Sequence, residues 1–301
     1  MLLRSFFMAP IYDIGRKDQG LFGFSSSKKD ARYHIYPIPW DVTTSYIDGT
    51  SNGPQQLLDA SIQLDCRTQD RQGNTCSSHW MADLDANQIT LNKKLRPKAK
   101  SIYETLEKGC VLTAKQESDL KAINAAGHKI NTWVESLVSS TLKDDKTPII
   151  LGGEHSVSYG AIKAYSEHFS DLGVVQIDAH MDLRDDYCGF ETSHASVMDA
   201  VLKSTSIHSI AQVACRDYSD DEAQRAADDK RIYTLSDKEI HDALFQGKTW
   251  DSLCERLCNI LPTHIYITFD CDGLSPCYCP HTGTPVPGGL PFNQSSIYLG
   301  N

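Results

Sequence analysis

The sequence lacks an apolar run near its N-terminus that is long enough to cross a membrane. Residues 1–12 form its most apolar N-terminal stretch, but Arg4, Ser5 and Pro10 interrupt it. A spanning helix needs roughly 20 apolar residues, and a secretory signal needs a small-residue cleavage site that is missing here. We therefore expect a soluble cytoplasmic protein without a membrane partner.

Positive charge is also scarce. Lys and Arg number 29 against 39 Asp and Glu, which gives a formal net charge of −10. Binding to nucleic acid or to an anionic membrane surface depends on clustered Lys and Arg. We therefore exclude both kinds of partner, whereas a small cationic substrate is compatible with the acidic composition.

The ten cysteines lack the spacing of a structural zinc site. Cys254 and Cys258 are four apart, and Cys271, Cys277 and Cys279 form a C-x5-C-x-C group, whereas zinc sites commonly use C-x2-C pairs. A chain of this length needs no disulfide framework. We expect reduced, buried thiols.

The chain is predicted to be one α/β domain with an N-terminal arm. Residues 1–32, which end in a polar run, are expected to be a poorly ordered arm, and residues 33–301 a single domain. No repeat with a period of 20–50 residues is present, which excludes solenoids and propellers. The expected strands are 33–38, 148–151, 173–177, 210–214, 232–235 and 265–269. The expected helices are one that opens at 53–54 and those at 93–108, 118–142, 157–168, 195–202, 237–245 and 250–260.

This alternation predicts how the domain is layered. Apolar strands between amphipathic helices are typical of a mainly parallel sheet that helices cover on both faces, a three-layer αβα architecture. In such sheets, ligands bind beyond the carboxyl ends of the strands.

Three of the expected strands end in side chains that can bind metal. The segments are Gly152-Gly153-Glu154-His155-Ser156, Asp178-Ala179-His180-Met181-Asp182 and Asp270-Cys271-Asp272-Gly273. Residues two apart in an extended chain point to the same side, so the ligands within each of the last two segments converge. Two imidazoles and four carboxylates suffice for two divalent ions. A mainly oxygen ligand set favours manganese, with iron, cobalt or nickel as alternatives and zinc less favoured.

Each motif alone has a simpler structural explanation. His155 could cap a turn, Asp178-x-His180-x-Asp182 could be a solvated loop, and Asp270-x-Asp272 could begin a helix. Four acids together at the ends of apolar strands would repel one another and resist burial unless a cation neutralised them. The combination therefore indicates a metal site.

The motifs resemble those of the arginase/agmatinase ureohydrolases. The resemblance is carried by residues 152–156, 178–184, 193–195, 269–276 and 282–290, and it runs from about residue 37 to the C-terminus. It implies the arginase-like ureohydrolase fold and a homo-oligomer. Residues 45–54 and 183–187 resemble the agmatinase branch more than arginase.

The resemblance implies a binuclear-metal hydrolase of polyamine metabolism that cleaves an agmatine-like guanidino compound to urea and an amine. A water that bridges the two ions would become hydroxide and attack the guanidinium carbon. Asp182 and Asp272 would orient it while ligating, and His194 would shuttle protons toward the departing amine. Guanidinobutyrate, formiminoglutamate, arginine or guanidine as substrate stays open, as does an inactive metal-binding relative.

Two departures from the family pattern affect these expectations. Residues 277–281 differ from the usual run, so the wall of the substrate pocket should differ too. In relatives, a further strand lies beside the one that ends in Asp270 and carries a glutamate that binds the guanidinium group, but the sequence stops at Asn301, and residues 295–301 could replace that strand only in part. We therefore expect a C-terminally incomplete domain with two unpaired strand edges, weak activity and poor stability.

Overall fold

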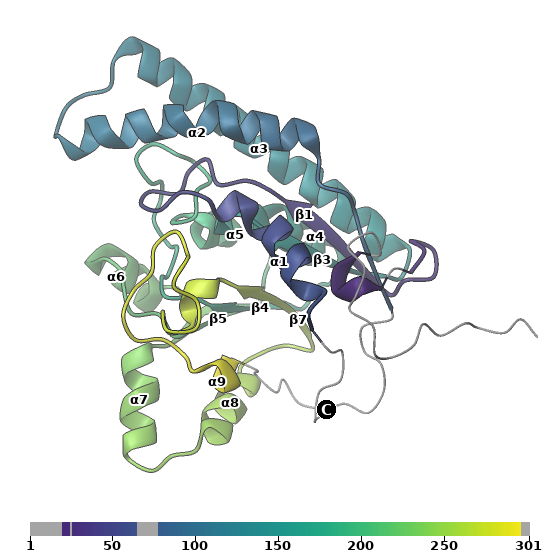
Figure 1. Ribbon diagram of the computed structural model, residues 1–301. Coiled ribbons are helices and arrows are strands. Elements are labelled where there is room, and N and C mark those ends of the chain that lie inside the picture. The colour runs from purple at the N-terminus through teal and green to yellow at the C-terminus, as the bar shows by residue number, and fades with distance from the viewer. Residues whose placement is uncertain (1–19, 25, 65–77, 296–301) are drawn as a thin grey trace, which may run out of the picture.

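Two parallel sheets form the centre of the protein (Figure 1). The structure, a computed structural model, describes residues 20–24, 26–64 and 78–295. One sheet has the order β2-β1-β3 and the other the order β6-β5-β4-β7, and all of their strand pairs are parallel. The strands are β1 (Tyr33–Ile38), β2 (His79–Met81), β3 (Thr147–Gly152), β4 (Leu172–Ile177), β5 (Ser209–Val213), β6 (Ile232–Leu235) and β7 (His264–Phe269).

Helices cover both faces of the four-stranded sheet, because its strands are apolar on both sides. Val174 of β4 packs in one core cluster with Ile162 of α4, whereas the next residue, Val175, packs in another with Ile240 of α7. The helices are α1 (Gly53–Ser61), α2 (Ala86–Glu107), α3 (Ala114–Lys143), α4 (Ser158–His168), α5 (Val197–Ser204), α6 (Asp220–Asp228), α7 (Asp237–Phe245), α8 (Trp250–Cys258) and α9 (Phe292–Ser295). This arrangement confirms the three-layer α/β prediction.

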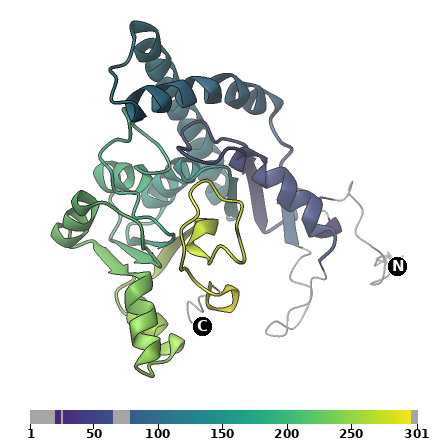
Figure 2. The ribbon, with the colours of Figure 1, turned by 60° about the vertical axis from the view of Figure 1, so that its left-hand side comes forward.

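The two longest helices begin earlier than their apolar pattern predicted. The Asp85 carboxylate accepts a hydrogen bond from Asn87 N at 2.7 Å and starts α2. Thr113 and Gln116 form a reciprocal capping box that starts α3. Figures 1 and 2 show these helices as a long pair on the outside of the domain. Strand β2 was not predicted at all.

The described part of the expected N-terminal arm is hydrogen-bonded to the domain. Phe22 N donates to Ser61 Oγ at 2.9 Å, and Arg32 N donates to Ser78 O at 3.0 Å. The rest of the arm, 1–19 and 25, lies outside the described residues, as does most of the 295–301 segment. Within the described ranges, no helix is both long and apolar enough to span a membrane.

The expectation of buried thiols is only partly confirmed. Cys215 and Cys254 are buried, but Cys271 and Cys277 are exposed. The loop that carries the exposed pair follows β7, and a loop at the surface need not bury its side chains.

The outer edges of β3 and β7 carry no partner strand among the described residues. Both strands expose apolar side chains: Ile149 is 41% exposed, Ile267 51% and Phe269 41%. Strands β4 and β5, which have partners on both sides, are buried throughout. The two open edges therefore leave apolar surface in contact with solvent.

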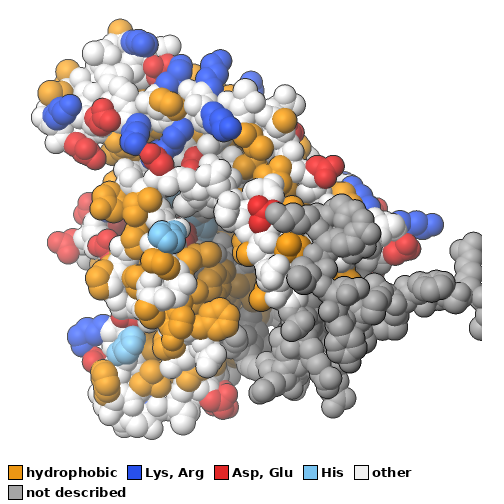
Figure 3. All heavy atoms as spheres, in the orientation of Figure 1, with side chains coloured by type: hydrophobic (Ala, Val, Ile, Leu, Met, Phe, Trp, Pro, Cys, Tyr) orange, Lys and Arg blue, Asp and Glu red, His pale blue; other side chains and the backbone are white. Residues whose placement is uncertain are grey.

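Both open edges lie against the same helix, α4. Tyr165 of α4 donates a hydrogen bond to Pro148 O of β3 at 3.3 Å, and its ring packs 5.2 Å from that of Tyr266 in β7. Figure 3 shows apolar side chains gathered over the segment that follows β7, residues 271–295, which is yellow in Figure 1. Tyr278 and Phe292 of that segment are 54% and 60% exposed, and their ring centroids are 6.4 Å apart.

We expect backbone amides on the open sides of β3 and β7 to exchange hydrogen faster than those of β4 and β5. An amide without a strand partner is protected only by local structure, so its exchange needs no opening of the sheet. Hydrogen exchange followed by mass spectrometry measures this difference. Equal protection of β3 and β4 would contradict it.

Matched variants connect these edges to self-association. Ile267→Lys places a charge on an open edge and should reduce association in light scattering with little loss of stability. Ile210→Lys, at a fully buried position of β5, should instead unfold the protein.

Candidate metal centre

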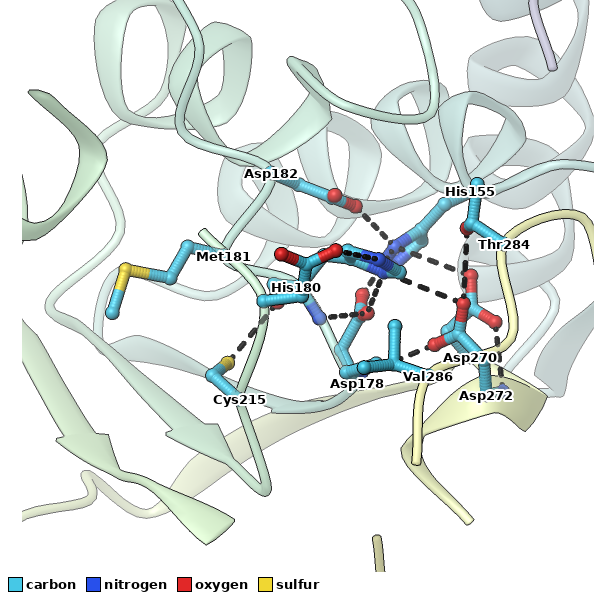
Figure 4. A network of polar contacts seen from close by, with 12 residues as sticks. His155, Asp178, His180, Met181, Asp182, Cys215, Asp270, Asp272, Thr284 and Val286 are labelled. Atoms are coloured by element: carbon cyan, nitrogen blue, oxygen red, sulfur yellow. Dashed lines mark hydrogen bonds and ion pairs between the residues drawn. The ribbon is translucent and has the colours of Figure 1, made fainter. Parts of the chain in front are cut away.

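The six predicted ligands come together at the carboxyl ends of three strands (Figure 4). His155 follows β3 and begins a 3-10 turn, Asp178, His180 and Asp182 follow β4, and Asp270 and Asp272 follow β7. Strand β4 pairs with β7, so the last five side chains start from neighbouring strand ends. His155 reaches them from the other sheet.

Two ligand groups share one carboxylate. The ligand atoms of His155, Asp178 and Asp270 lie within 4.8 Å of one another, and so do those of Asp178, His180 and Asp272. Asp178 belongs to both groups, and its two oxygens face different imidazoles. Asp178 could therefore contribute one oxygen to each of the two groups.

His155 is at the centre of the first group. Its Nδ1 lies 2.7 Å from Asp182 Oδ2, 2.9 Å from Asp178 Oδ2 and 3.8 Å from Asp270 Oδ2. The sixth predicted ligand, Asp182, therefore lies against the same imidazole nitrogen. Asp182 has a φ of 55°, in the left-handed region that a residue with a side chain rarely adopts.

His180 is at the centre of the second group. Its Nδ1 lies 3.4 Å from Asp272 Oδ2 and 3.5 Å from Asp178 Oδ1. The side chains of His180 and Asp270 are 21% and 27% exposed, whereas those of Asp178 and Asp182 are at most 5% exposed. The centre therefore opens to solvent on the side of His180 and Asp270.

The pKa values show how strongly the centre attracts positive charge. Burial, together with the charge of Asp178, raises the pKa of the Asp182 carboxyl to about 7. Burial alone would lower the pKa of His180, but hydrogen bonds to Asp178 and Asp272 raise it to about 11. Protons thus supply the positive charge that the crowded carboxylates need. Divalent ions would supply it equally, and these nitrogen and oxygen donors suit manganese.

Close backbone packing fixes the turns that carry the ligands. A Cβ at Gly153 would lie 2.1 Å from Trp40 O, and one at Gly273 would lie 2.8 Å from Asp178 N. Only glycine allows these approaches. The first joins the His155 turn to the end of β1, and the second joins the Asp272 turn to the Asp178 backbone.

Arg216 fixes the Asp272 turn from the end of β5. Its Nη2 donates to Asp272 O at 2.6 Å and to Val286 O at 2.9 Å, and its Nε donates to Pro287 O at 3.0 Å. Thr284 Oγ1 lies 3.3 Å from Asp272 Oδ2. Residues 284–287 are therefore connected both to this ligand and to its backbone.

A buried glutamate connects the His155 turn to residues 43–44. The Glu154 carboxylate accepts hydrogen bonds at 2.8 Å from Thr43 Oγ1 and at 2.9 Å from Ser156 Oγ. Burial raises the pKa of Glu154 to about 7 despite these hydrogen bonds. Ile47 N donates to Gly283 O at 2.9 Å, so residues 43–47 also contact the segment after β7.

His194 lies beside these residues with one unpaired nitrogen. Its Nε2 is 3.2 Å from Ser45 Oγ, and its ring packs edge-on to Tyr187 at 5.6 Å. Nδ1 is buried without a hydrogen-bond partner among the described residues. Burial, followed by the charge on His180, lowers the pKa of His194 to about 3. The imidazole is therefore neutral at neutral pH.

Several contacts of the centre were missed in the sequence. Thr268 Oγ1 lies 2.7 Å from His155 Nε2, and Arg216, Thr284 and Ser45 make the contacts described above. None of these residues belongs to a motif with metal-binding spacing. His281, the last residue of the 277–281 run that departs from the family pattern, is exposed.

Paired carboxylate and imidazole groups at the strand ends of a three-layer α/β fold are the arrangement expected of a metal-dependent hydrolase. The chain belongs to the arginase family, whose match covers residues 31–299. This confirms the family and the enzyme class that the motifs predicted.

The chain is similar to several named proteins. It is 29% identical over 266 residues to an N(1)-aminopropylagmatine ureohydrolase of Synechocystis, covering 88% of this chain and 74% of the relative. It is 27% identical over 264 residues to an agmatinase of Bacillus cereus, covering 88% and 76%. The solved agmatine ureohydrolase of Thermoplasma volcanium aligns with a TM-score of 0.66 at 23% identity, over 90% of this chain and 77% of that one.

The low pKa of His194 predicts a stability that depends on pH. An exposed histidine has a pKa of about 6.5. Between that value and the folded value of about 3, the unfolded chain takes up a proton that the folded chain does not, so stability falls as the pH drops through this window. We expect His194 to contribute a loss on the order of 1–2 kcal/mol from pH 6.5 to pH 5.

Urea denaturation of the metal-free protein at both pH values measures this loss. His194→Asn carries no titrating imidazole and should lose less stability than the unchanged chain over the same interval. An identical loss in both proteins would show that His194 titrates normally when folded.

Proposed function

We propose that this protein hydrolyses the guanidinium group of a small agmatine-like compound to urea and an amine, with two divalent ions. The proposed metal ligands are His155, Asp178, His180, Asp182, Asp270 and Asp272. The observation that carries the proposal is that two ligand groups share Asp178. A shared carboxylate between two groups is suited to a binuclear centre and is unnecessary for a single ion.

Two bound divalent ions would supply a hydroxide nucleophile near neutral pH and stabilise the charge that develops during attack. Manganese is the preferred ion, because four of the six ligands are carboxylates, and nickel is the alternative. Zinc sites more often include thiolates, and none of the described cysteines belongs to either ligand group.

Asp182 and Asp272 are proposed to orient the nucleophile in addition to binding metal. Asp182 Oδ2 lies 2.7 Å from His155 Nδ1, the atom proposed to bind metal, and Asp272 Oδ1 is fixed by a hydrogen bond from Ala179 N at 3.1 Å. A carboxylate fixed in this way can accept a hydrogen bond from the nucleophile without reorganising. Both residues therefore have a role in positioning as well as in charge.

His194 is proposed to carry protons between the site and solvent. The neutral imidazole can accept a proton at Nδ1, which has no partner among the described residues, while Nε2 contacts Ser45 Oγ. Because the pKa of His194 is low, a proton received there would be released quickly toward the departing amine or water.

An agmatine-like substrate is favoured over arginine. The two named enzymes most relevant here are described as acting on agmatine or on an aminopropyl derivative of it. Residues 45–54 resemble the agmatinase branch in sequence, and within them Ser45 contacts His194 and Ile47 contacts Gly283. The expected homo-oligomer and the cytoplasmic location stay predictions.

The function is tested by urea release from a panel of guanidino compounds. We expect release from agmatine or a close analogue with Mn²⁺ added and none from the metal-free protein. The panel includes guanidinobutyrate, formiminoglutamate, arginine and guanidine, each with Mn²⁺ and with Ni²⁺. No release from any compound with either metal would overturn the proposal.

Bound metal gives an independent test of the ligands. Asp182→Ala and Asp272→Ala should each lower the bound metal, measured by elemental analysis, below the two ions expected for the unchanged chain. Asp242→Ala is the matched control, because Asp242 is exposed and pairs with Lys238 away from the centre. Unchanged occupancy in both ligand variants would mean that the metals bind elsewhere.

His194→Asn should keep both metals and lose at least about 100-fold in kcat, because a proton shuttle acts on the reaction and not on metal binding. Elemental analysis and steady-state kinetics with the preferred substrate measure the two effects. Wild-type kcat in a well-folded variant would assign the proton transfer to another group.

A further inference from the structure

A row of polar side chains crosses the otherwise apolar four-stranded sheet just before the metal centre. In the strand register, Gln176 of β4 is opposite Gln212 of β5 and Thr268 of β7, and Gln212 is opposite Thr234 of β6. Four neighbouring strands therefore carry a polar residue at the same level. Both glutamine side chains are fully buried.

Two residues before each member of the polar row, on the same face of the sheet, the side chain is apolar. Val174, Ile210, Ile232 and Tyr266 occupy these positions and belong to, or pack against, one core cluster. Packing alone would be served by another apolar row, and buried amides cost free energy unless they are hydrogen-bonded. The polar row therefore needs an explanation beyond filling the core.

The hydrogen bonds of three of these residues run in one direction, toward Asp178. Thr234 Oγ1 donates to Gln212 Oε1 at 3.1 Å, Gln212 Nε2 donates to Gln176 Oε1 at 2.8 Å, and Gln176 Nε2 donates to Asp178 Oδ2 at 2.9 Å. The direction is fixed, because only the NH₂ end of Gln176 can face a carboxylate. The row thus delivers a donor to the carboxylate that both ligand groups share.

The second N–H of each glutamine holds the loop that carries three ligands. Gln176 Nε2 also donates to His180 O at 3.3 Å, and Gln212 Nε2 donates to Met181 O at 2.8 Å. The next residue, Asp182, has the unfavourable φ of 55°. Such a conformation persists only where surrounding contacts impose it. The glutamines supply two of those contacts.

The fourth polar residue, Thr268, contacts His155, the proposed ligand that follows β3 of the three-stranded sheet. Thr268 Oγ1 lies 2.7 Å from His155 Nε2, the nitrogen opposite the one that faces the carboxylates. A hydrogen bond at Nε2 keeps the ring orientation and leaves Nδ1 free to act as a ligand.

We propose that Gln176, Gln212, Thr234 and Thr268 form a polar row whose task is to position the metal ligands. They are positioning residues: none belongs to a ligand group, and each acts through Asp178, His155 or the 178–182 backbone. This inference rests on the proposed function for its purpose, but its geometry can be tested in the metal-free protein.

The test uses variants that keep side-chain size and remove hydrogen bonds. Gln176→Met should speed amide hydrogen exchange in residues 179–182 of the metal-free protein and weaken Mn²⁺ binding roughly 10–100-fold, as is typical for partners of metal ligands. Free Mn²⁺, measured by electron paramagnetic resonance, gives the affinity. In Gln176→Met/Gln212→Met, the loss should be smaller than the product of the two single losses, because the residues act through one chain of hydrogen bonds.

Two further variants separate positioning from general stability. Thr268→Val should weaken Mn²⁺ binding, whereas Thr268→Ser keeps the hydroxyl and should restore it. Thr141→Val is the structural control. Thr141 Oγ1 of α3 lies 2.7 Å from Tyr36 OH of β1, in a buried contact at the other sheet. Loss of this contact should lower stability and leave both the 179–182 exchange and the Mn²⁺ affinity unchanged.

The results distinguish this inference from the proposed function. Unchanged 179–182 exchange in Gln176→Met, in a protein with wild-type circular dichroism, would overturn the polar row even if urea is released. Faster exchange in that variant, without the same change in Thr141→Val, would support the row even if the unchanged chain binds no Mn²⁺ or hydrolyses no compound on the panel.

Discussion

The structure depends on one electrostatic requirement: four carboxylates lie together at the ends of apolar strands and need positive charge close by. Asp178 and Asp182 are almost fully buried, so water cannot screen their repulsion. Two imidazoles meet part of the requirement, and their contacts with the carboxylates are as short as 2.7 Å. Divalent ions bound between these carboxylates would neutralise their charge. The same ligand set therefore suits a metal-dependent hydrolase.

The contacts around the ligands hold the backbone in unfavourable conformations that a loop without a functional role would not need. Gly153 and Gly273 permit close backbone approaches, Asp182 holds a left-handed backbone, and Arg216 donates to several carbonyl oxygens of one turn. Unfavourable conformations of this kind cluster where geometry serves chemistry. The buried glutamines extend this support into the sheet, so the metal ligands are positioned from within the core as well as from loops.

The sequence predicted that the candidate ligands lie close together, because the information for this is local. A spacing of two predicted that Asp178, His180 and Asp182 point the same way; in the structure Asp178 and His180 share one group, and Asp182 instead lies against His155. The contacts that were missed depend on which strands are neighbours: Thr268 meets His155 only because β7 lies near β3, and Gln212 meets Gln176 only in the observed register. Helix starts were missed for another reason, since Asp85 and Thr113 act as caps outside the apolar pattern that was followed.

The proposed centre also bridges the two sheets. His155 is the single proposed ligand from the three-stranded sheet, and the other five follow β4 and β7 of the four-stranded sheet. Since β3 and β7 have no shared hydrogen-bond ladder, the junction relies on α4 and on side chains such as His155 and Thr268. Any ion held by His155 and Asp178 together would therefore join the two sheets as well as serve the reaction. Because such an ion binds the folded chain preferentially, its binding energy would add to the stability of this junction.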